Sequence, residues 1–157
     1  MNKVLKKLMT SVIALIILSS CVFETIPVFG QVNNVALKKD VYAVSTKASS
    51  STANVTDGNY ETAWESGNDW NRWVEIDLNG TYKINGVKVF TSVDQIVTFN
   101  VYVSNDNVNF NKVASKLDET KATAEGYTLL FDEINAVKVR IAITYNSQSS
   151  IVKLNEV

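Results

Sequence analysis

The segment Val137-Lys138-Val139-Arg140-Ile141-Ala142-Ile143-Thr144 decides the fold class. Large apolar residues occupy every second position, and polar or small residues stand between them. Successive side chains of a β-strand point to opposite faces, so this period of two predicts a strand with one buried face and one face in water. The segment Val97-Thr98-Phe99-Asn100-Val101-Tyr102-Val103-Ser104 has the same pattern. We therefore expect both segments to be half-buried strands.

Five further segments are rich in apolar, β-branched or aromatic residues and are also expected to be strands: 73–78, 84–90, 111–117, 127–131 and 151–157. Clusters of turn-forming residues separate them, such as Asn79-Gly80 and Ser104-Asn105-Asp106-Asn107. The sequence has no segment with the 3.6-residue apolar period of a helix. Many short strands joined by turns predict an all-β fold, namely an antiparallel β-sandwich.

The composition excludes several classes of function. Of the 157 residues, 46% are hydrophobic and 20% are charged, which is sufficient for one packed domain. The 15 basic and 16 acidic residues nearly balance, so the chain lacks the positive charge of a nucleic-acid-binding protein. Histidine is absent, which removes Ser-His-Asp and Cys-His catalysis and zinc sites that depend on imidazole.

The first thirty residues have the features of a secretion signal. Three lysines precede the apolar run 9–23, which is too short and too interrupted by polar residues to be a permanent membrane anchor. Gly30 ends a pattern that suits cleavage. The sequence therefore predicts a signal peptide over 1–30 and a secreted domain over 31–157.

Cys21 gives this leader a second interpretation. It is the only cysteine and follows Leu18-Ser19-Ser20, which is similar to the lipobox of bacterial lipoproteins. Cleavage there would make Cys21 a lipid-anchored first residue, whereas cleavage after Gly30 would discard it. Both alternatives place the domain outside the cytoplasm. Without the leader's three lysines and Glu24, 12 basic and 15 acidic residues remain, and this balance disfavours binding to anionic membranes.

A series of short landmarks runs along the predicted domain. In order, they are Asn34-Val35-Ala36, Asp57-Gly58-Asn59, Thr62, Trp64, Ser66, the segments 73–78, 101–106 and 136–141, and Leu154-Asn155-Glu156-Val157. In this order and spacing they resemble the coagulation factor 5/8 type C (discoidin-like) family, which includes the family 32 carbohydrate-binding modules. The resemblance implies a galactose-binding-like jelly roll that recognises ligands with its loops. Lys138 departs from the family, which usually has an aromatic residue at this position.

The resemblance also implies a structural calcium ion. The matching positions are the Asn54 carbonyl, Asp57, Asn59, Thr62, the Asn155 carbonyl and Glu156. Independently of the family, Asp57-Gly58-Asn59 and Thr62 place hard oxygen donors close together, and such donors suit calcium. Asn155 and Glu156 come from the other end of the domain, so a shared ion would close a long loop. The alternative is a turn that is held by Asx hydrogen bonds without a metal.

The loop 65–72 is the predicted ligand-binding region. It is rich in Gly, Asn and Asp and lies between Trp64 and Trp73, which are expected to be core residues. Trp70 stands within this polar loop, where an exposed indole would offer a flat platform to a sugar ring. The alternative is that Trp70 plugs the end of the barrel. The candidate ligand-binding residues are Glu65, Asn68, Trp70, Asn71, Arg72, Tyr145 and Asn146.

The family's usual galactose contacts do not transfer to this chain. Galactose-binding relatives usually carry a histidine where this chain has Glu65, and an arginine and an asparagine in a loop that corresponds to 92–95 and lacks both here. We therefore expect a glycan or cell-surface polysaccharide of unspecified identity, and no nucleic acid. The alternative is adhesion to membrane phospholipid or to a protein, although Trp70 with Arg72 provides fewer exposed apolar residues than membrane insertion requires. The oligomeric state is left open.

Glu75-Ile76-Asp77 suggests one enzymatic alternative. Its two carboxylates share one face of a strand and resemble the start of the Glu-x-Asp-x-x-Glu motif of retaining glucanases. The third acid is missing, because position 80 is Gly80. The same two residues fit the polar side of a strand, with Asp77 capping the turn at Asn79-Gly80. We therefore expect a non-catalytic protein without catalytic residues.

Overall fold

The computed structural model describes residues 33–67, 71–147 and 151–157. In chain order, its strands are β1 (Asp40–Ala43), β2 (Trp64–Glu65), β3 (Arg72–Thr91), β4 (Val97–Ser104), β5 (Asn111–Lys116), β6 (Tyr127–Asn146) and β7 (Lys153–Glu156). A short 3-10 helix, η1 (Thr52–Val55), lies between β1 and β2. All of these elements belong to the compact unit Asn34–Val157. The predicted signal peptide and Cys21 lie outside the described residues.

Within the described ranges, no helix has the length and apolar character needed to cross a bilayer.

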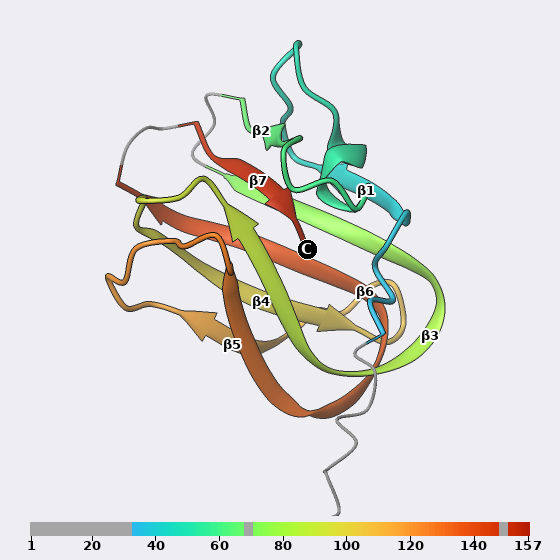
Figure 1. Ribbon diagram of the computed structural model, residues 1–157. Coiled ribbons are helices and arrows are strands. Elements are labelled where there is room, and N and C mark those ends of the chain that lie inside the picture. Colours follow the sequence, from blue (N-terminus) through green and yellow to red (C-terminus); the bar gives the residue numbers. More distant parts are fainter. Residues whose placement is uncertain (1–32, 68–70, 148–150) are drawn as a thin grey trace, which may run out of the picture. The chain divides into compact units, whose positions relative to one another are not determined.

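Two long strands, β3 and β6, connect the two layers of the fold (Figure 1). They pair antiparallel from Arg72 opposite Ile143 to Val89 opposite Tyr127. The first part of β3 and the last part of β6 form a five-stranded layer with β1, β4 and β5, in the order β1-β3-β6-β4-β5. The last residues of β3, Phe90 and Thr91, pair with β7, which in turn pairs with β2. The named strands pair antiparallel throughout. This arrangement confirms the predicted antiparallel β-sandwich.

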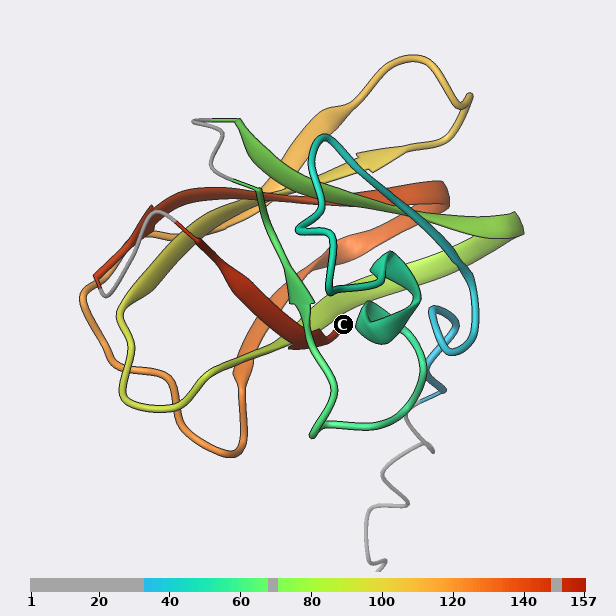
Figure 2. The ribbon, with the colours of Figure 1, turned by 90° about the horizontal axis from the view of Figure 1, so that it is seen from above.

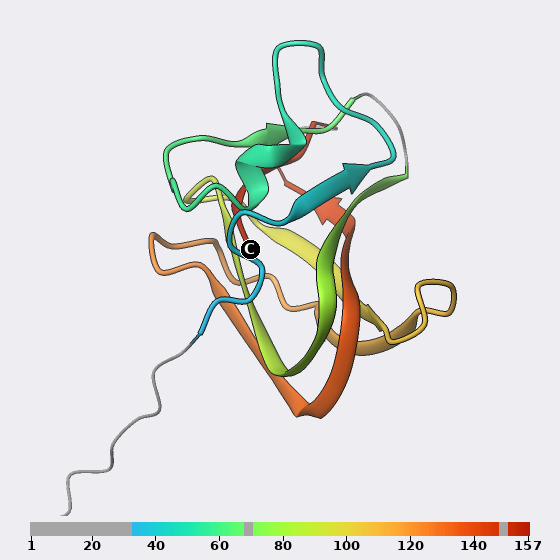
Figure 3. The ribbon, with the colours of Figure 1, turned by 90° about the vertical axis from the view of Figure 1, so that its right-hand side faces the viewer.

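The strand boundaries differ from the prediction at two places. The segments 73–78 and 84–90 are one strand, β3, and the segments 127–131 and 137–144 are likewise one strand, β6. Asn79 and Gly80 have positive φ angles of 55° and 151°, and the register with β6 shifts next to them. These residues therefore bend the strand as a bulge instead of ending it. Figure 3 shows β3 and β6 bending together at the bottom of the view.

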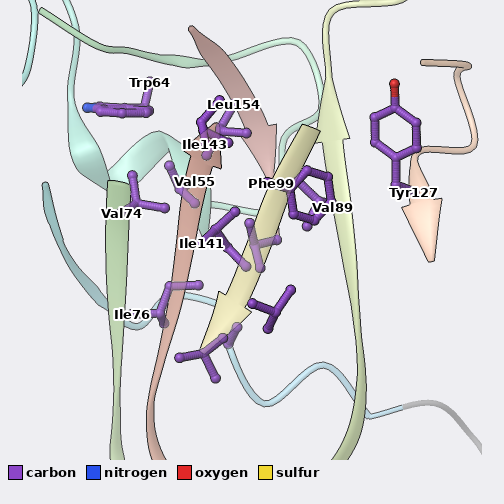
Figure 4. Packing of buried hydrophobic residues seen from close by; sticks show 14 of the residues in the cluster. Val55, Trp64, Val74, Ile76, Val89, Phe99, Tyr127, Ile141, Ile143 and Leu154 are labelled. Carbon is purple, nitrogen blue, oxygen red and sulfur yellow. The ribbon is translucent and has the colours of Figure 1, made fainter. Parts of the chain in front are cut away.

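The core lies between the layers and is built from the inward-facing half of each strand. Trp64, Val74, Ile76, Phe99 and Ile141 are completely buried. Figure 4 shows these side chains with others from β3, β4, β6 and β7. The prediction that Trp64 is a core residue is confirmed.

The prediction that Trp73 belongs to the core is wrong. Trp73 precedes Val74 on β3 and therefore points to the opposite face, where it is half-buried. Its ring packs against the guanidinium of Arg140 on the outer face of the five-stranded layer.

The last residues of the described domain lie against η1 and the turn that follows it. The Val157 amide donates to the Val55 carbonyl at 2.9 Å, and the Gly58 amide donates to Oε2 of Glu156 at 3.1 Å. Figure 2 shows η1 beside β7. The fold thereby places a turn near the start of the domain against its last strand.

Candidate functional site

The candidate metal-binding residues gather around the turn 57–62. Oδ2 of Asp57 accepts a hydrogen bond from the Thr62 hydroxyl at 2.7 Å, and the Gly58 amide joins the turn to Glu156. The side-chain amide of Asn155 donates to the carbonyls of Tyr60 and Thr62 at 3.0 and 3.1 Å. Asp57 and Thr62 therefore lie close to Asn155 and Glu156 from the last strand.

Asn54 and Asn59 lie at the edge of this cluster. The side-chain amide of Asn54 donates to the Ala63 carbonyl at 2.9 Å and so braces the segment that follows the turn. Asn59 is exposed, and its Oδ1 accepts from the Glu61 amide at 3.1 Å. Together with the bond of 2.7 Å from the Asn59 amide to Oδ1 of Asp57, this gives two consecutive Asx turns. Each carboxylate or amide oxygen has a second lone pair, so these turns and a bound cation are compatible.

Two buried oxygen atoms of the cluster lack a hydrogen-bond partner among the described residues. They are Oε1 of Glu156, whose residue is 2% exposed, and Oδ1 of Asn155. Burial raises the pKa of Glu156 to about 6, and the charge of Asp57 acts in the same direction against the Gly58 amide. A cation would satisfy the unpaired oxygens and reduce the repulsion between the two carboxylates.

The donor chemistry fits calcium. Among the described residues, no three acidic, histidine or cysteine side chains are placed to hold a metal ion together. Asp57 and Glu156 are accompanied instead by the Thr62 hydroxyl and by amide and carbonyl oxygens. Calcium accepts such mixed oxygen ligands.

The candidate ligand-binding residues that the structure describes lie at one end of the sandwich, which we call the loop end. Glu65 ends β2 and lies opposite Lys153 at the start of β7. Arg72 begins β3, preceded by Asn71, and Tyr145 lies near the end of β6. The pairing of Arg72 with Ile143 brings the start of β3 beside the end of β6, and Asn146 at that end bonds the Ile151 carbonyl in the segment that leads to β7. Asn68 and Trp70 lie outside the described residues, so the interpretation of Trp70 as platform or plug stays a prediction.

Glu65 is engaged by two lysines. Its carboxylate lies 2.6 Å from Nζ of Lys47 and 3.1 Å from Nζ of Lys153. Hydrogen bonds from Lys47 and Lys153 lower the pKa of Glu65, so the group is ionised at neutral pH. The Lys47 amide also donates to the Glu65 carbonyl at 3.0 Å. Glu65 thus anchors the segment that contains Lys47 to the loop end.

Tyr145 and Asn146 have different environments. Tyr145 is 51% exposed, whereas Asn146 is buried and its side-chain amide donates to the Ile151 carbonyl at 2.9 Å. Ser66 is also buried and exchanges two hydrogen bonds of 2.9 Å with Val152. Asn146 and Ser66 therefore fix the shape of the loop end, and Tyr145 provides an aromatic surface.

Sequence reasoning missed Lys47 and Lys153 at this site. Lys47 lies 18 residues before Glu65, and Lys153 reaches Glu65 through the pairing of β2 with β7. β2 has only two residues. So short a strand leaves no periodic pattern in the sequence, and no signal of spacing connects the two lysines.

A family model for the NedA-like, galactose-binding domain of the F5/8 type C group matches residues 54–141. The chain belongs to this family. The match begins in η1, includes the turn 57–62 and ends within β6. It confirms the resemblance that the sequence landmarks indicate. A comparison with curated proteins found no match.

Solved structures with the same fold include carbohydrate-active proteins. A family 89 glycoside hydrolase from Clostridium perfringens, solved with its substrate GlcNAc-α-1,4-galactose, has a TM-score of 0.73 at 31% identity over 78% of this chain. This chain spans only 14% of the length of that enzyme. The similarity therefore concerns one module of that protein.

Two smaller neighbours are carbohydrate-binding modules along nearly their whole length. A family 32 module from C. perfringens, in complex with GalNAc-β-1,3-galactose, has a TM-score of 0.66 at 19% identity over 76% of this chain and 92% of its own. A chitosan-binding module from a Paenibacillus chitosanase/glucanase has a TM-score of 0.68 at 24% identity, covering 78% and 94%. At these identities the two neighbours show the fold. The chain has the fold of a carbohydrate-binding module.

Proposed function

We propose that the protein is a secreted, non-catalytic carbohydrate-binding module that recognises a glycan with its loop end and is stabilised by one calcium ion. The observation that carries this proposal is membership of the galactose-binding domain family together with the module fold. Neighbours of this fold were solved with GalNAc-β-1,3-galactose or are described as chitosan-binding. Both facts favour a glycan as the partner.

The loop end offers the two kinds of contact that a sugar needs. The exposed ring of Tyr145 can stack on the apolar face of a pyranose. Lys47 and Lys153, held by Glu65, and the exposed Asn71, which precedes β3, provide polar groups for hydroxyls. One platform with a few hydrogen bonds buries little area, so the dissociation constant is expected between millimolar and micromolar, or about −4 to −8 kcal/mol.

Calcium has a structural role in this proposal. Asp57, Thr62 and Glu156 would hold the ion, with the neighbouring Asn54, Asn59 and Asn155. The ion would supply the positive charge that the two carboxylates lack. The turn 57–62 leads directly into β2 and Glu65, so a rigid turn would fix one side of the loop end.

The carboxylates that suggest a glucanase are committed to structural contacts. Glu75 accepts hydrogen bonds from Lys138 at 2.8 Å and from Arg140 at 2.6 Å, and it is only 8% exposed. Asp77 accepts from the Asn79 amide at 2.8 Å, as expected for a turn cap. A carboxylate that is held by two cations is not free to attack a substrate, which supports a non-catalytic role.

A glycan array run beside liposome pelleting tests the ligand class. Tyr145→Ala and Trp70→Ala should each lose glycan signals that the wild type shows. Leu130→Ala, which alters an exposed apolar residue of β6 outside the loop end, should keep them. Pelleting with phosphatidylserine vesicles, without any glycan signal, would support the membrane alternative. Release of reducing sugar that Glu75→Gln abolishes would support the glucanase.

The exported form can be identified by mass spectrometry. Expression of the full chain in a secreting bacterial host should yield soluble protein that begins at Gln31. A membrane-bound form that begins at a lipid-modified Cys21 would establish the lipoprotein alternative, and intact Met1 in the cytoplasm would contradict secretion.

A further inference from the structure

The outer face of the five-stranded layer carries a row of aromatic and charged side chains. Tyr42 on β1 lies opposite Glu75 on β3. Arg140 on β6 lies between Glu75 and Tyr102 on β4. Paired residues of antiparallel strands point to the same face, so these side chains share the face that is turned away from the core. From Tyr42 to Tyr102 the row crosses three strand spacings, or about 14 Å.

Arg140 is held in the middle of this row. Its Nη2 and Nε donate to Oε2 of Glu75 at 2.6 and 3.2 Å. Its guanidinium carbon lies 4.6 Å from the ring centre of Trp73 and 3.8 Å from that of Phe110. A guanidinium that is stacked between two rings and tied to a buried carboxylate has lost most of its side-chain freedom. The rings beside it are therefore positioned before any ligand arrives.

The next row on the same face begins with Trp73 on β3. On β6, β4 and β5 it continues with short side chains, two of which are polar. Trp73 lies opposite Ala142, which lies opposite Asn100. Asn100 in turn lies opposite Ser115, and the Ser115 hydroxyl donates to Oδ1 of Asn100 at 2.7 Å. A flat molecule that lies beside Trp73 could extend across the strands over these short residues and meet hydrogen-bonding groups.

The charges of this face balance. Three cations, Lys112, Lys138 and Arg140, accompany three carboxylates, Asp40, Glu75 and Asp77. An anionic polymer or lipid surface needs an excess of positive charge, which this face lacks. The centre of a protein interface is depleted of charge and contiguous in apolar area, whereas the rings here alternate with charged groups. An uncharged sugar matches both properties, because it has hydroxyls that donate and accept and a C–H face that stacks on rings.

We propose that this outer face is a second glycan-binding surface, which takes an uncharged polysaccharide chain lying across β1, β3, β6 and β4. Tyr42 and Tyr102 are the stacking platforms, and Asn100 and Arg140 are polar contacts. The residues of this surface differ from the candidate ligand-binding set of the loop end, which begins next to it, at Arg72 before Trp73 on β3. Two surfaces on one module would let it bind a polymer at two places and gain avidity.

Affinity electrophoresis in native gels that contain a galactan, a xylan or a β-glucan tests this surface. The double variant Tyr42→Ala/Tyr102→Ala should be retarded about tenfold less strongly than the wild type by at least one of the gels, because it loses two platforms. Leu130→Ala is the control, since Leu130 on β6 is 77% exposed and lies opposite Gly86 of β3, outside both surfaces. The control should migrate like the wild type.

The outcomes separate this surface from the loop end. If circular dichroism shows that the double variant is unfolded, the single variant Tyr42→Ala tests the surface instead. The side chain of Tyr42 is largely exposed and absent from the core cluster. The second surface is overturned if a folded Tyr42 variant is retarded as strongly as the wild type while Tyr145→Ala is no longer retarded. That result supports the loop end as the binding site. Wild-type protein that none of the three gels retards also overturns the second surface, whereas the glycan array still decides the proposed function.

Discussion

At the scale of single residues, Glu75 shows how this sheet tolerates a buried charge. Burial disfavours the carboxylate and by itself raises the pKa of Glu75, but hydrogen bonds from Lys138 and Arg140 outweigh that effect and lower the pKa. Its side chain is 11% exposed, and those of Lys138 and Arg140 are 17% and 28% exposed. The carboxylate of Glu75 is therefore a structural anion, and its contribution to stability depends on both cations.

We predict that Glu75→Gln destabilises the protein by about 2 kcal/mol at pH 7, because the charged hydrogen bonds are lost. A carboxylate whose folded-state pKa is lowered adds stability above its unfolded pKa of about 4.3, and this stability disappears as the pH falls through the folded-state pKa. The difference between the wild type and Glu75→Gln in urea unfolding should therefore shrink between pH 7 and pH 3.

The exposed ion pair of Lys83 and Glu133 provides the control for Glu75. Their side chains are 69% and 58% exposed, so solvent screens the attraction. Glu133→Gln should unfold like the wild type at both pH values. A difference for Glu75→Gln that stays constant from pH 7 to pH 3 would contradict an electrostatic role of Glu75.

The faces of individual residues could be predicted where the sequence alternates strictly. The alternation in 73–78 puts Glu75 and Asp77 on the polar side, and the structure agrees. The same alternation puts Trp73 on that side, whereas its size suggests a core residue. The prediction from size is the wrong one. The phase of the strand outweighs the preference of an indole for burial, because the outer face offers Trp73 a partner in Arg140.

At the scale of elements, two strands are longer than their sequence pattern predicts. Asn79-Gly80 has turn chemistry, and the prediction ends a strand there. In the structure, Asn79 and Gly80 adopt positive φ angles within β3, and β6 follows the same bend. A turn and a bulge use the same residue types, so the local sequence does not distinguish them. Pairing with β6, more than 45 residues away, decides between them.

Lys116 ends β5 and organises the segment that follows. It is 3% exposed, and its Nζ donates to the carbonyls of Asp118 and Thr120 at 2.5 and 2.9 Å. The same Nζ lies 3.2 Å from Oδ1 of Asp118 and 4.7 Å from the ring centre of Tyr127. This buried amine therefore ties the connection between β5 and β6 to the sandwich.

We predict that Lys116→Met destabilises the protein by about 2 kcal/mol, because methionine keeps the length but removes the donors. Hydrogen exchange should accelerate most at the amides of Asp94 and Ala122, which bond the same connection to the segment before β4. Lys112→Met changes an exposed lysine of the same strand and should leave these amides unaffected. Unchanged exchange at Asp94 and Ala122 in Lys116→Met would show that Lys116 does not order this segment.

At the scale of the whole domain, the candidate metal site could be predicted far better than the loop end. The family resemblance assigns Asp57 and Glu156 to one site, and the structure joins this part of the chain by a bond between residues 98 positions apart. The loop end depends on β2, which has two residues, and on Lys47 and Lys153, which no motif connects. Contacts that only the assembled sheet creates leave no local signal in the sequence.

Calcium should act on the domain as a link between its ends. We predict that calcium at about one hundred times its dissociation constant stabilises the protein by about 2.7 kcal/mol relative to a chelator. Thermal unfolding in calcium and in EDTA measures this difference. Glu133→Gln, which removes an exposed carboxylate elsewhere, should respond to calcium like the wild type. Equal midpoints of the wild type in calcium and in EDTA would exclude the metal.

The effect of Glu156→Gln should have opposite signs in the two conditions. Without metal, the carboxylate of Glu156 is buried near Asp57, and its raised pKa of about 6 shows that the charge is unfavourable at neutral pH. A shift of this size corresponds to about 2 kcal/mol, so Glu156→Gln should be more stable than the wild type in EDTA at pH 7. With calcium, the wild type gains the ion and the variant does not, so the order of their unfolding midpoints should reverse. A purely structural hydrogen bond to Gly58 predicts no such reversal, because its contribution does not depend on calcium.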